Sequence, residues 1–166
     1  MPNKMIIKNK IDQLRKGYPT ISDKYNVAGG ILESSSADAE YGDLIMYGTT
    51  TGYYKKAVNI AAATDIAGVL LATNVKLTGT WPDDGATTTK TKKGEAFNLM
   101  LDGYVAIQLD AAYTPAETMA GKKLAVILAT GKLTTLDKVA AGIIEMPGYY
   151  FTGIVENGLA EIEIRR

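Results

Sequence analysis

Short apolar segments separated by glycine-containing turns make up the chain from about residue 27 onward. Within this part, residues 104–109 and 159–165 alternate between apolar and polar side chains. Because successive side chains of a strand point to opposite faces, the alternation predicts half-buried antiparallel strands. In the second of these strands, Glu161 and Glu163 are expected to face outward.

Two other segments are apolar on both faces, which is typical of strands covered on both sides. They are Ile66–Ala72 and Leu124–Ala129. Four further strands are expected at residues 43–47, 53–58, 95–101 and 151–156. The pattern therefore predicts an all-β fold over residues 26–166, a compact antiparallel β-barrel or sandwich of about nine short strands.

Two short segments depart from the strand pattern. Ala57–Ala63 is rich in alanine and is compatible with a helical turn. Thr114-Pro115-Ala116-Glu117 has the form of a capping box, and Gly121 limits any helix that begins there to about two turns. The fold is therefore expected to contain at most short helices, placed on connections.

Residues 1–25 differ from the rest and are expected to form a basic N-terminal arm. Ile7, Ile11 and Leu14 recur at helical spacing. Because so short a helix is marginal alone in water, it would need to dock on the body, on a neighbouring subunit or on a partner, and we expect these three side chains to be its anchors. The basic residues expected to meet an acidic partner surface are Lys4, Lys8, Arg15 and Lys16.

Charge is distributed unevenly, although the whole chain is neutral. Six lysines and arginines against two aspartates give residues 1–25 a net charge of +4, which leaves −4 on the body. A short basic leader on an acidic domain indicates contact with another molecule, and a solvated terminus is the alternative interpretation.

A long polar loop is expected at residues 78–93, with Trp81 as its one bulky apolar residue. Loops of this length are usually functional or disordered. On an exposed loop Trp81 would be an interface anchor. Folded back, it would cover one end of the barrel, and the sequence leaves both interpretations open.

Histidine and cysteine are absent. Their absence excludes disulfides, cysteine nucleophiles, histidine triads and zinc sites built on thiolate or imidazole. Asp83 and Asp84 beside Gly85 have the ligand type for a hard cation, but this sequence is also an ordinary turn. We therefore expect no catalytic residue, no cofactor and no metal. A glycosidase or lyase that uses only carboxylates is the enzymatic alternative.

Tyrosine is abundant, with 10 residues, and includes the doublets Tyr53-Tyr54 and Tyr149-Tyr150. In a strand each doublet turns one ring inward and the other outward. Outward tyrosine rings supply rigid contact area, so Tyr53 and Tyr149 are expected to contact a partner. The acidic body argues against nucleic acid and favours a protein as that partner.

No apolar run reaches the roughly 20 residues of a membrane span. The N-terminus is too charged for the core of a signal peptide. The protein is therefore expected to stay in the compartment where it is made, without a membrane partner or a small-molecule substrate.

An ordered set of motifs built on glycine and aliphatic residues resembles the capsid cement (decoration) proteins of tailed phages. The motifs are Ala39–Ile45, Ile66–Ala72, Lys93–Glu95 with Leu101–Ile107, Ala120–Val126, Gly131–Thr134 and Phe151–Ile164. The resemblance covers residues 27–166 and implies a β-barrel on the outside of the phage head, often a trimer, that ties capsomers together. It implies no catalytic residues. The arm and the loop at residues 78–93 are the least similar parts.

These observations predict a virion structural protein, made in the host cytoplasm, that binds the head surface and bridges subunits of the major capsid protein. It is expected to be a homo-oligomer, and the resemblance favours a trimer. The alternatives are another virion β-protein, such as a head-fibre base or a tail or baseplate component, and a carbohydrate-binding module.

Overall fold

Nearly all of the ordered secondary structure is β-strand. The computed structural model describes residues 14, 16–20, 25–72, 90–110, 119–135 and 140–165. Its strands are β1 (Asn26–Leu32), β2 (Ala39–Glu40), β3 (Leu44–Tyr47), β4 (Tyr53–Lys56), β5 (Ile66–Leu70), β6 (Lys90–Thr91), β7 (Ala96–Ile107), β8 (Lys123–Ile127), β9 (Leu133–Thr135), β10 (Ile143–Glu156) and β11 (Leu159–Ile164). A single 3-10 turn, η1 (Ala63–Asp65), is present in this part of the chain. The predicted all-β class is confirmed.

Five of the strands close into a barrel. Their order is β1-β4-β3-β5-β7, and β7 pairs with β1 to complete the ring. The β1–β4 pair is parallel, and the other four pairs are antiparallel. Closure removes the unpaired strand edges that would otherwise attract other chains.

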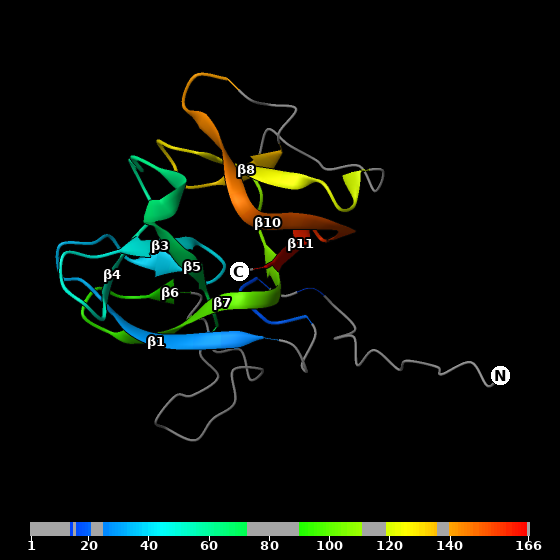
Figure 1. The fold of residues 1–166 in the computed structure, drawn as a ribbon. Helices are drawn as coiled ribbons and strands as arrows, with labels where there is room; N and C mark the ends of the chain where they lie inside the picture. The colour runs from blue at the N-terminus through cyan, green and yellow to red at the C-terminus, as the bar shows by residue number, and fades with distance from the viewer. Residues whose placement is uncertain are drawn as a thin grey trace.

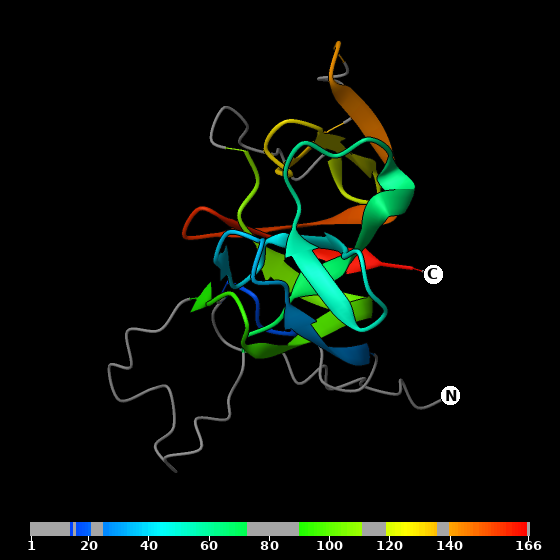
Figure 2. The same ribbon diagram turned by 90° about the vertical axis from the view of Figure 1, so that its left-hand side faces the viewer.

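A second sheet grows from the same long strand, in the order β7-β11-β10-β8-β9. Residues 96–102 of β7 pair with β1, whereas residues 103–107 pair with β11. Gly103, with a φ of 121°, lies where the partner changes and adopts a conformation that favours glycine. Figure 1 shows β8, β10, β11, β7 and β1 from top to bottom, and Figure 2 shows β10 and β11 between the barrel and β8.

Two apolar clusters lie on opposite faces of β3, β5 and β7. The cluster inside the barrel draws on all five of its strands, through Leu32, Tyr54, Ile45, Leu70 and Leu99. The larger cluster joins the outer faces of β3, β5 and β7 to the second sheet. This arrangement explains why β5 is buried at all five of its positions, as its uniformly apolar sequence predicted.

Asp43 links the barrel to the second sheet. Its carboxylate accepts hydrogen bonds from Lys56 Nζ on β4, at 2.9 Å, and from Lys132 Nζ beyond β8, at 3.1 Å. The backbone N–H of Glu40 donates to it at 2.9 Å. Burial alone would raise the pKa of Asp43, but the lysines and the Glu40 N–H outweigh burial and hold this pKa below its usual value. The junction therefore contains a buried but neutralised carboxylate.

The turn between β8 and β9 packs tightly against the segment that follows β4. The N–H groups of Asn59 and Ile60 donate to the carbonyls of Ala129 and Leu128, at 3.3 and 2.9 Å. Gly131 in this turn has a φ of 67°, and a Cβ atom there would collide with the carbonyl oxygen of Ala57. Glycine is therefore required twice over at this position, by conformation and by space.

Several strands are longer or additional compared with the sequence prediction. The segments expected at 95–101 and 104–109 form one continuous strand, β7, and β10 begins eight residues before the expected start at residue 151. Lys90–Thr91, expected within the polar loop, pairs with β2. The helical turn begins at Ala63, the last residue of the alanine-rich segment. The capping box at 114–117 lies outside the described residues.

Gly131→Ala is expected to lower the free energy of unfolding by ~2–5 kcal/mol, because a left-handed backbone costs ~1–2 kcal/mol and the collision a further ~1–3 kcal/mol. Gly142→Ala is the matched control, since Gly142 has a φ of 84° but open surroundings. For that variant only the backbone cost of ~1–2 kcal/mol is expected. Urea titrations measure both values, and equal losses would contradict a tight junction.

Candidate functional site

Six of the ten residues expected to contact a partner lie outside the described residues. They are Lys4, Ile7, Lys8, Ile11, Arg15 and Trp81. Contact by these six stays a prediction. The remaining four are Leu14, Lys16, Tyr53 and Tyr149, and the structure shows where each of them lies.

Leu14 and Lys16 contact the body of their own chain. Leu14 is buried, and its N–H donates to Glu156 Oε2 at 2.9 Å, at the end of β10. Lys16 Nζ lies 2.6 Å from Glu40 Oε2. Between them and β1, residues 17–20 run beside β7, where Pro19 bridges Val105. Leu14 is therefore packed on the body of its own chain, whereas Lys16 stays half-buried and its contact with a partner stays a prediction.

Tyr149 is the buried member of its doublet, with 1% of its surface exposed. Its ring belongs to the cluster between the barrel and the second sheet. The expectation that Tyr149 contacts a partner is wrong, because the outward residue is Tyr150. The sequence pattern predicted one ring on each side of the strand but does not say which ring faces the core. That choice depends on which face of β10 is turned toward the core.

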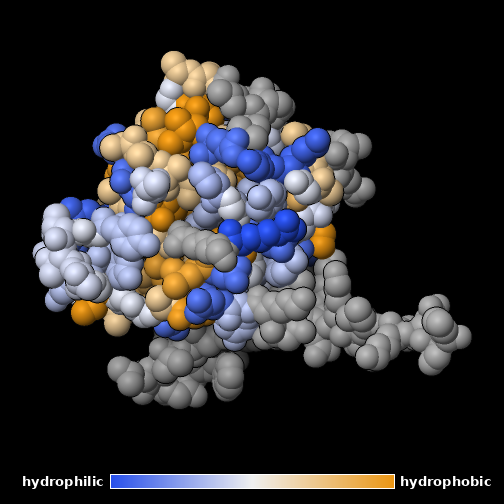
Figure 3. Space-filling view, viewed as in Figure 1, coloured by the Kyte–Doolittle hydropathy of each residue, from blue (hydrophilic) through white to orange (hydrophobic). Residues whose placement is uncertain are grey.

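Tyr53 is exposed at the barrel end formed by the β3–β4 turn. Ile31 pairs with Tyr53 across β1 and β4. Tyr47, at the end of β3, is 53% exposed, but it pairs with Tyr54 and therefore points to the opposite face of the strands from Tyr53. Tyr53 itself is 41% exposed. We call Ile31, Tyr47 and Tyr53 the tyrosine end. Figure 3 shows a mostly pale surface, intermediate between hydrophilic and hydrophobic, on the left of the molecule, where Figure 1 places β3 and β4. Sequence reasoning missed Tyr47 and Ile31, although Tyr47 closes one of the expected strands.

The tyrosine end is supported from within the barrel by other rings. Tyr54, opposite Tyr47 in the β3–β4 ladder, packs against it with ring centroids 6.0 Å apart. Tyr54 in turn meets Phe97 edge-on at 5.7 Å. Aromatic contacts of this kind stabilise one arrangement of the rings. Tyr47 therefore stands on a packed base, whereas Tyr53 faces away from these rings.

Glu33 holds the backbone of the β3–β4 turn. It is 8% exposed, and its Oε1 accepts hydrogen bonds from the N–H of Thr49 at 2.5 Å and from Thr49 Oγ1 at 2.9 Å. Its Oε2 accepts one from Ser35 Oγ at 3.0 Å and lies 3.2 Å from Lys55 Nζ. The bond from the Thr49 N–H, helped by the other donors and opposed by burial, lowers the pKa of Glu33 to about 2.

The tyrosine end has the form of a binding surface. An aromatic surface fixed before contact loses little conformational freedom on binding. Among the described residues, no group of acids is placed to hold a metal ion, and no helix is long and apolar enough to cross a membrane. Exposed tyrosine rings are typical of protein interfaces.

Comparison with known proteins identifies the family. A family model described as structural cement protein (E217 gp24/Pam3 gp6) matches residues 11–165. The chain belongs to this structural cement protein family. No curated protein sequence is matched.

A solved structure shares the fold of this family member. A chain of "The capsid of Myoviridae Phage XM1" is similar with a TM-score of 0.64 and 14% sequence identity, over 100% of this chain and 99% of that chain. Membership of the cement family gives the protein a structural role, the stabilisation of the capsid in a phage head. The resemblance inferred from the motifs is thereby confirmed, and association with capsid proteins follows from it.

Replacing Glu33 by Gln is expected to remove part of the loss of stability on acidification. In the folded chain Glu33 stays ionised down to a pKa of about 2, whereas in the unfolded chain it takes up a proton near 4.5. Its contribution is therefore complete above pH 4.5 and is lost as pH falls from there to about 2. Urea midpoints between pH 2 and 6 should converge for wild type and Glu33→Gln toward low pH. A constant gap would contradict this role, and Glu145→Gln, which removes an exposed carboxylate, is the control.

Proposed function

We propose that this cement protein attaches to the outer surface of the phage head and bridges neighbouring subunits of the major capsid protein. Its role in stabilising the capsid follows from the family. The bridging mode is supported by the tyrosine end, a rigid contact surface on a closed barrel. A protein that binds only the assembled shell stabilises that shell by mass action.

Bridging requires at least two contacts on each molecule. The tyrosine end supplies one, and its rings are of the residue type that dominates binding at protein interfaces. The second contact proposed is the basic N-terminal segment, with Lys4, Ile7, Lys8 and Ile11 ahead of the point where Leu14 joins the body. Two linked contacts raise the overall affinity well above that of either one. No catalytic step is part of this proposal.

Assembly into a homo-oligomer, with a trimer favoured, belongs to the same proposal. Three copies joined around one axis would present three tyrosine ends to the shell at once, which multiplies the effect of a modest single contact. Light scattering on the purified protein measures the number of copies.

Tyr47→Ser and Tyr53→Ser are each expected to weaken binding to cement-free heads by about tenfold or more, the usual loss at an interface hot spot. Tyr25→Ser is the matched control, because Tyr25 is 49% exposed but lies at the opposite end of β1. Sedimentation of heads with increasing protein gives the three affinities. If the tyrosine-end variants bind like the control, this surface does not contact the shell.

Deleting residues 1–13 is expected to lower head binding while leaving thermal stability unchanged. Deleting residues 1–20 should also destabilise the body, because it removes the backbone hydrogen bonds of Gly17, Tyr18 and Thr20 to β7. Melting curves and head occupancy of both deletions separate the two effects. Full occupancy after the shorter deletion would rule out a contact through the N-terminal segment.

A further inference from the structure

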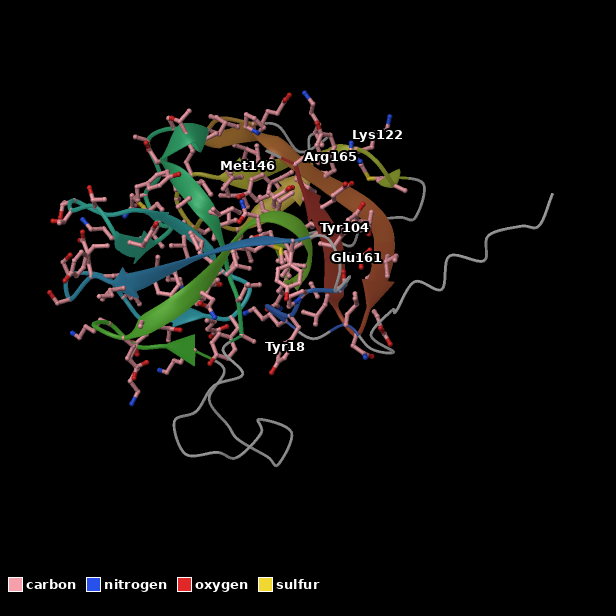
Figure 4. All side chains as sticks on the ribbon, turned by 60° about the horizontal axis from the view of Figure 1, so that its bottom comes forward. Tyr18, Tyr104, Lys122, Met146, Glu161 and Arg165 are labelled. Carbon is pink, nitrogen blue, oxygen red and sulfur yellow. The ribbon has the colours of Figure 1, made fainter. Side chains whose placement is uncertain are left out.

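A groove of about 290 Å³ crosses the outer face of the second sheet. Its walls include Tyr104 of β7, Tyr150 and Ile154 of β10, and Glu161, Glu163 and Arg165 of β11 and its end. Figure 4 shows Tyr104, Glu161 and Arg165 in one column beside β10 and β11. None of these residues belongs to the tyrosine end.

Strand parity explains why polar side chains gather in the groove. On β11, Ala160, Ile162 and Ile164 enter the core, so the alternate residues face the groove. Glu163 pairs with Tyr104 on one side and with Tyr150 on the other. The two rings therefore flank the Glu163 carboxylate across three neighbouring strands.

Arg165 shows that these walls accept a cation. Its guanidinium lies 4.6 Å from the centroid of the Tyr150 ring, and Nη2 lies 2.5 Å from Glu163 Oε2. A cation over an aromatic face is attracted by the ring. The hydroxyl of Tyr104 is also hydrogen-bonded to Glu163, and burial, together with this bond, raises the pKa of Tyr104, which keeps it a donor. Glu163 is thus already satisfied from two sides.

Glu161 differs from Glu163 in both burial and partners. Only 4% of its surface is exposed, although the alternation of the sequence predicted an outward side chain. The hydrogen bond from Thr152 Oγ1, at 3.1 Å, goes to its backbone carbonyl. Within the described part of the chain, its carboxylate makes no hydrogen bond or ion pair. Its oxygens are not among the buried polar atoms without a partner in the described residues, so they are reached by solvent from the groove. A carboxylate placed in this way can pair with a cation that enters the groove.

We infer that Glu161 receives a lysine or arginine side chain of the major capsid protein, inserted into this groove. This inference rests on the proposed function, which brings the two proteins together. The groove carries two carboxylates and one guanidinium on its walls, so one further cation would neutralise it. Arg165 between Tyr150 and Glu163 is the local example of how such a cation is held.

Glu161→Gln is the variant that tests the inference, because it keeps the shape of the side chain and removes its charge. We expect binding to cement-free heads to weaken at least tenfold at low salt, with a smaller difference at high salt, where charge pairs are screened. The free protein should melt at the wild-type temperature, since within the described residues this carboxylate makes no hydrogen bond or ion pair that the change would break. Glu145→Gln, a carboxylate on the exposed Lys123–Glu145 pair of the same sheet, should bind as wild type.

Two results would overturn the inference. If the Glu161→Gln variant binds heads as tightly as wild type, the groove does not contact the shell. If the variant melts at a lower temperature than wild type, Glu161 has a structural role instead. Failure of the wild-type protein to bind heads would overturn the proposed function itself, so the two failures are distinguishable.

Carbodiimide cross-linking of decorated heads identifies the source of the cation. The reagent joins a carboxylate directly to a lysine amine with loss of water. A link from Glu161 to the major capsid protein supports the inference, whereas a link to Lys4, Lys8 or Lys10 of a cement chain overturns the assigned source. Weakened binding by Glu161→Gln without any cross-link assigns the cation to an arginine, which the reagent does not couple.

Discussion

The pairing of one strand, β7, holds the whole arrangement together. Its first half closes the barrel through β1 and β5, and its second half carries β11 and with it the second sheet. Leu99 and Met100, neighbours on this strand, enter different clusters. A shift of β7 by one residue would exchange the two clusters, so the register is strongly determined. Both the tyrosine end and the groove derive their positions from strands paired, directly or through one neighbour, with β7.

The sequence predicts those strands whose burial follows from a local pattern of apolar and polar residues. β5 and β11 could be recognised because their apolar residues follow the two-sided and one-sided patterns of strands. β1 and the first half of β10 escaped recognition, since Gly29-Gly30 and Pro147-Gly148 read as turns. In the structure both pairs lie within strands: a Cβ on Gly30 would meet the Tyr54 ring, and the β10 register shifts between Glu145 and Tyr150. Such non-local contacts leave no local signal.

The site was less predictable than the fold, and the reasons are geometric. Tyrosine doublets predict one exposed ring each, but the choice between Tyr149 and Tyr150 depends on which face of β10 meets the core. Leu14 and Lys16 look like parts of a free arm because their partners, Glu156 and Glu40, are distant in sequence. Glu161 alternates like an outward residue and lines the outer groove, yet only 4% of its surface is exposed. Exposure is a property of the assembled fold, which periodicity alone does not contain.

Stiffness between the tyrosine end and the groove matters as much as the contacts that we propose for them. The tyrosine end belongs to the barrel, whereas the groove belongs to the second sheet. Asp43, paired with Lys56 and Lys132, and Gly131, pressed on Ala57, join these two parts at points away from β7. A protein attached to a shell through two sites restrains the shell only if the distance between those sites is fixed, because a flexible joint would follow the movement of the subunits. Under the proposed function, the buried Asp43 carboxylate and the close contact of Gly131 would keep the distance between the tyrosine end and the groove fixed. This role would add to their effect on the stability of the isolated chain.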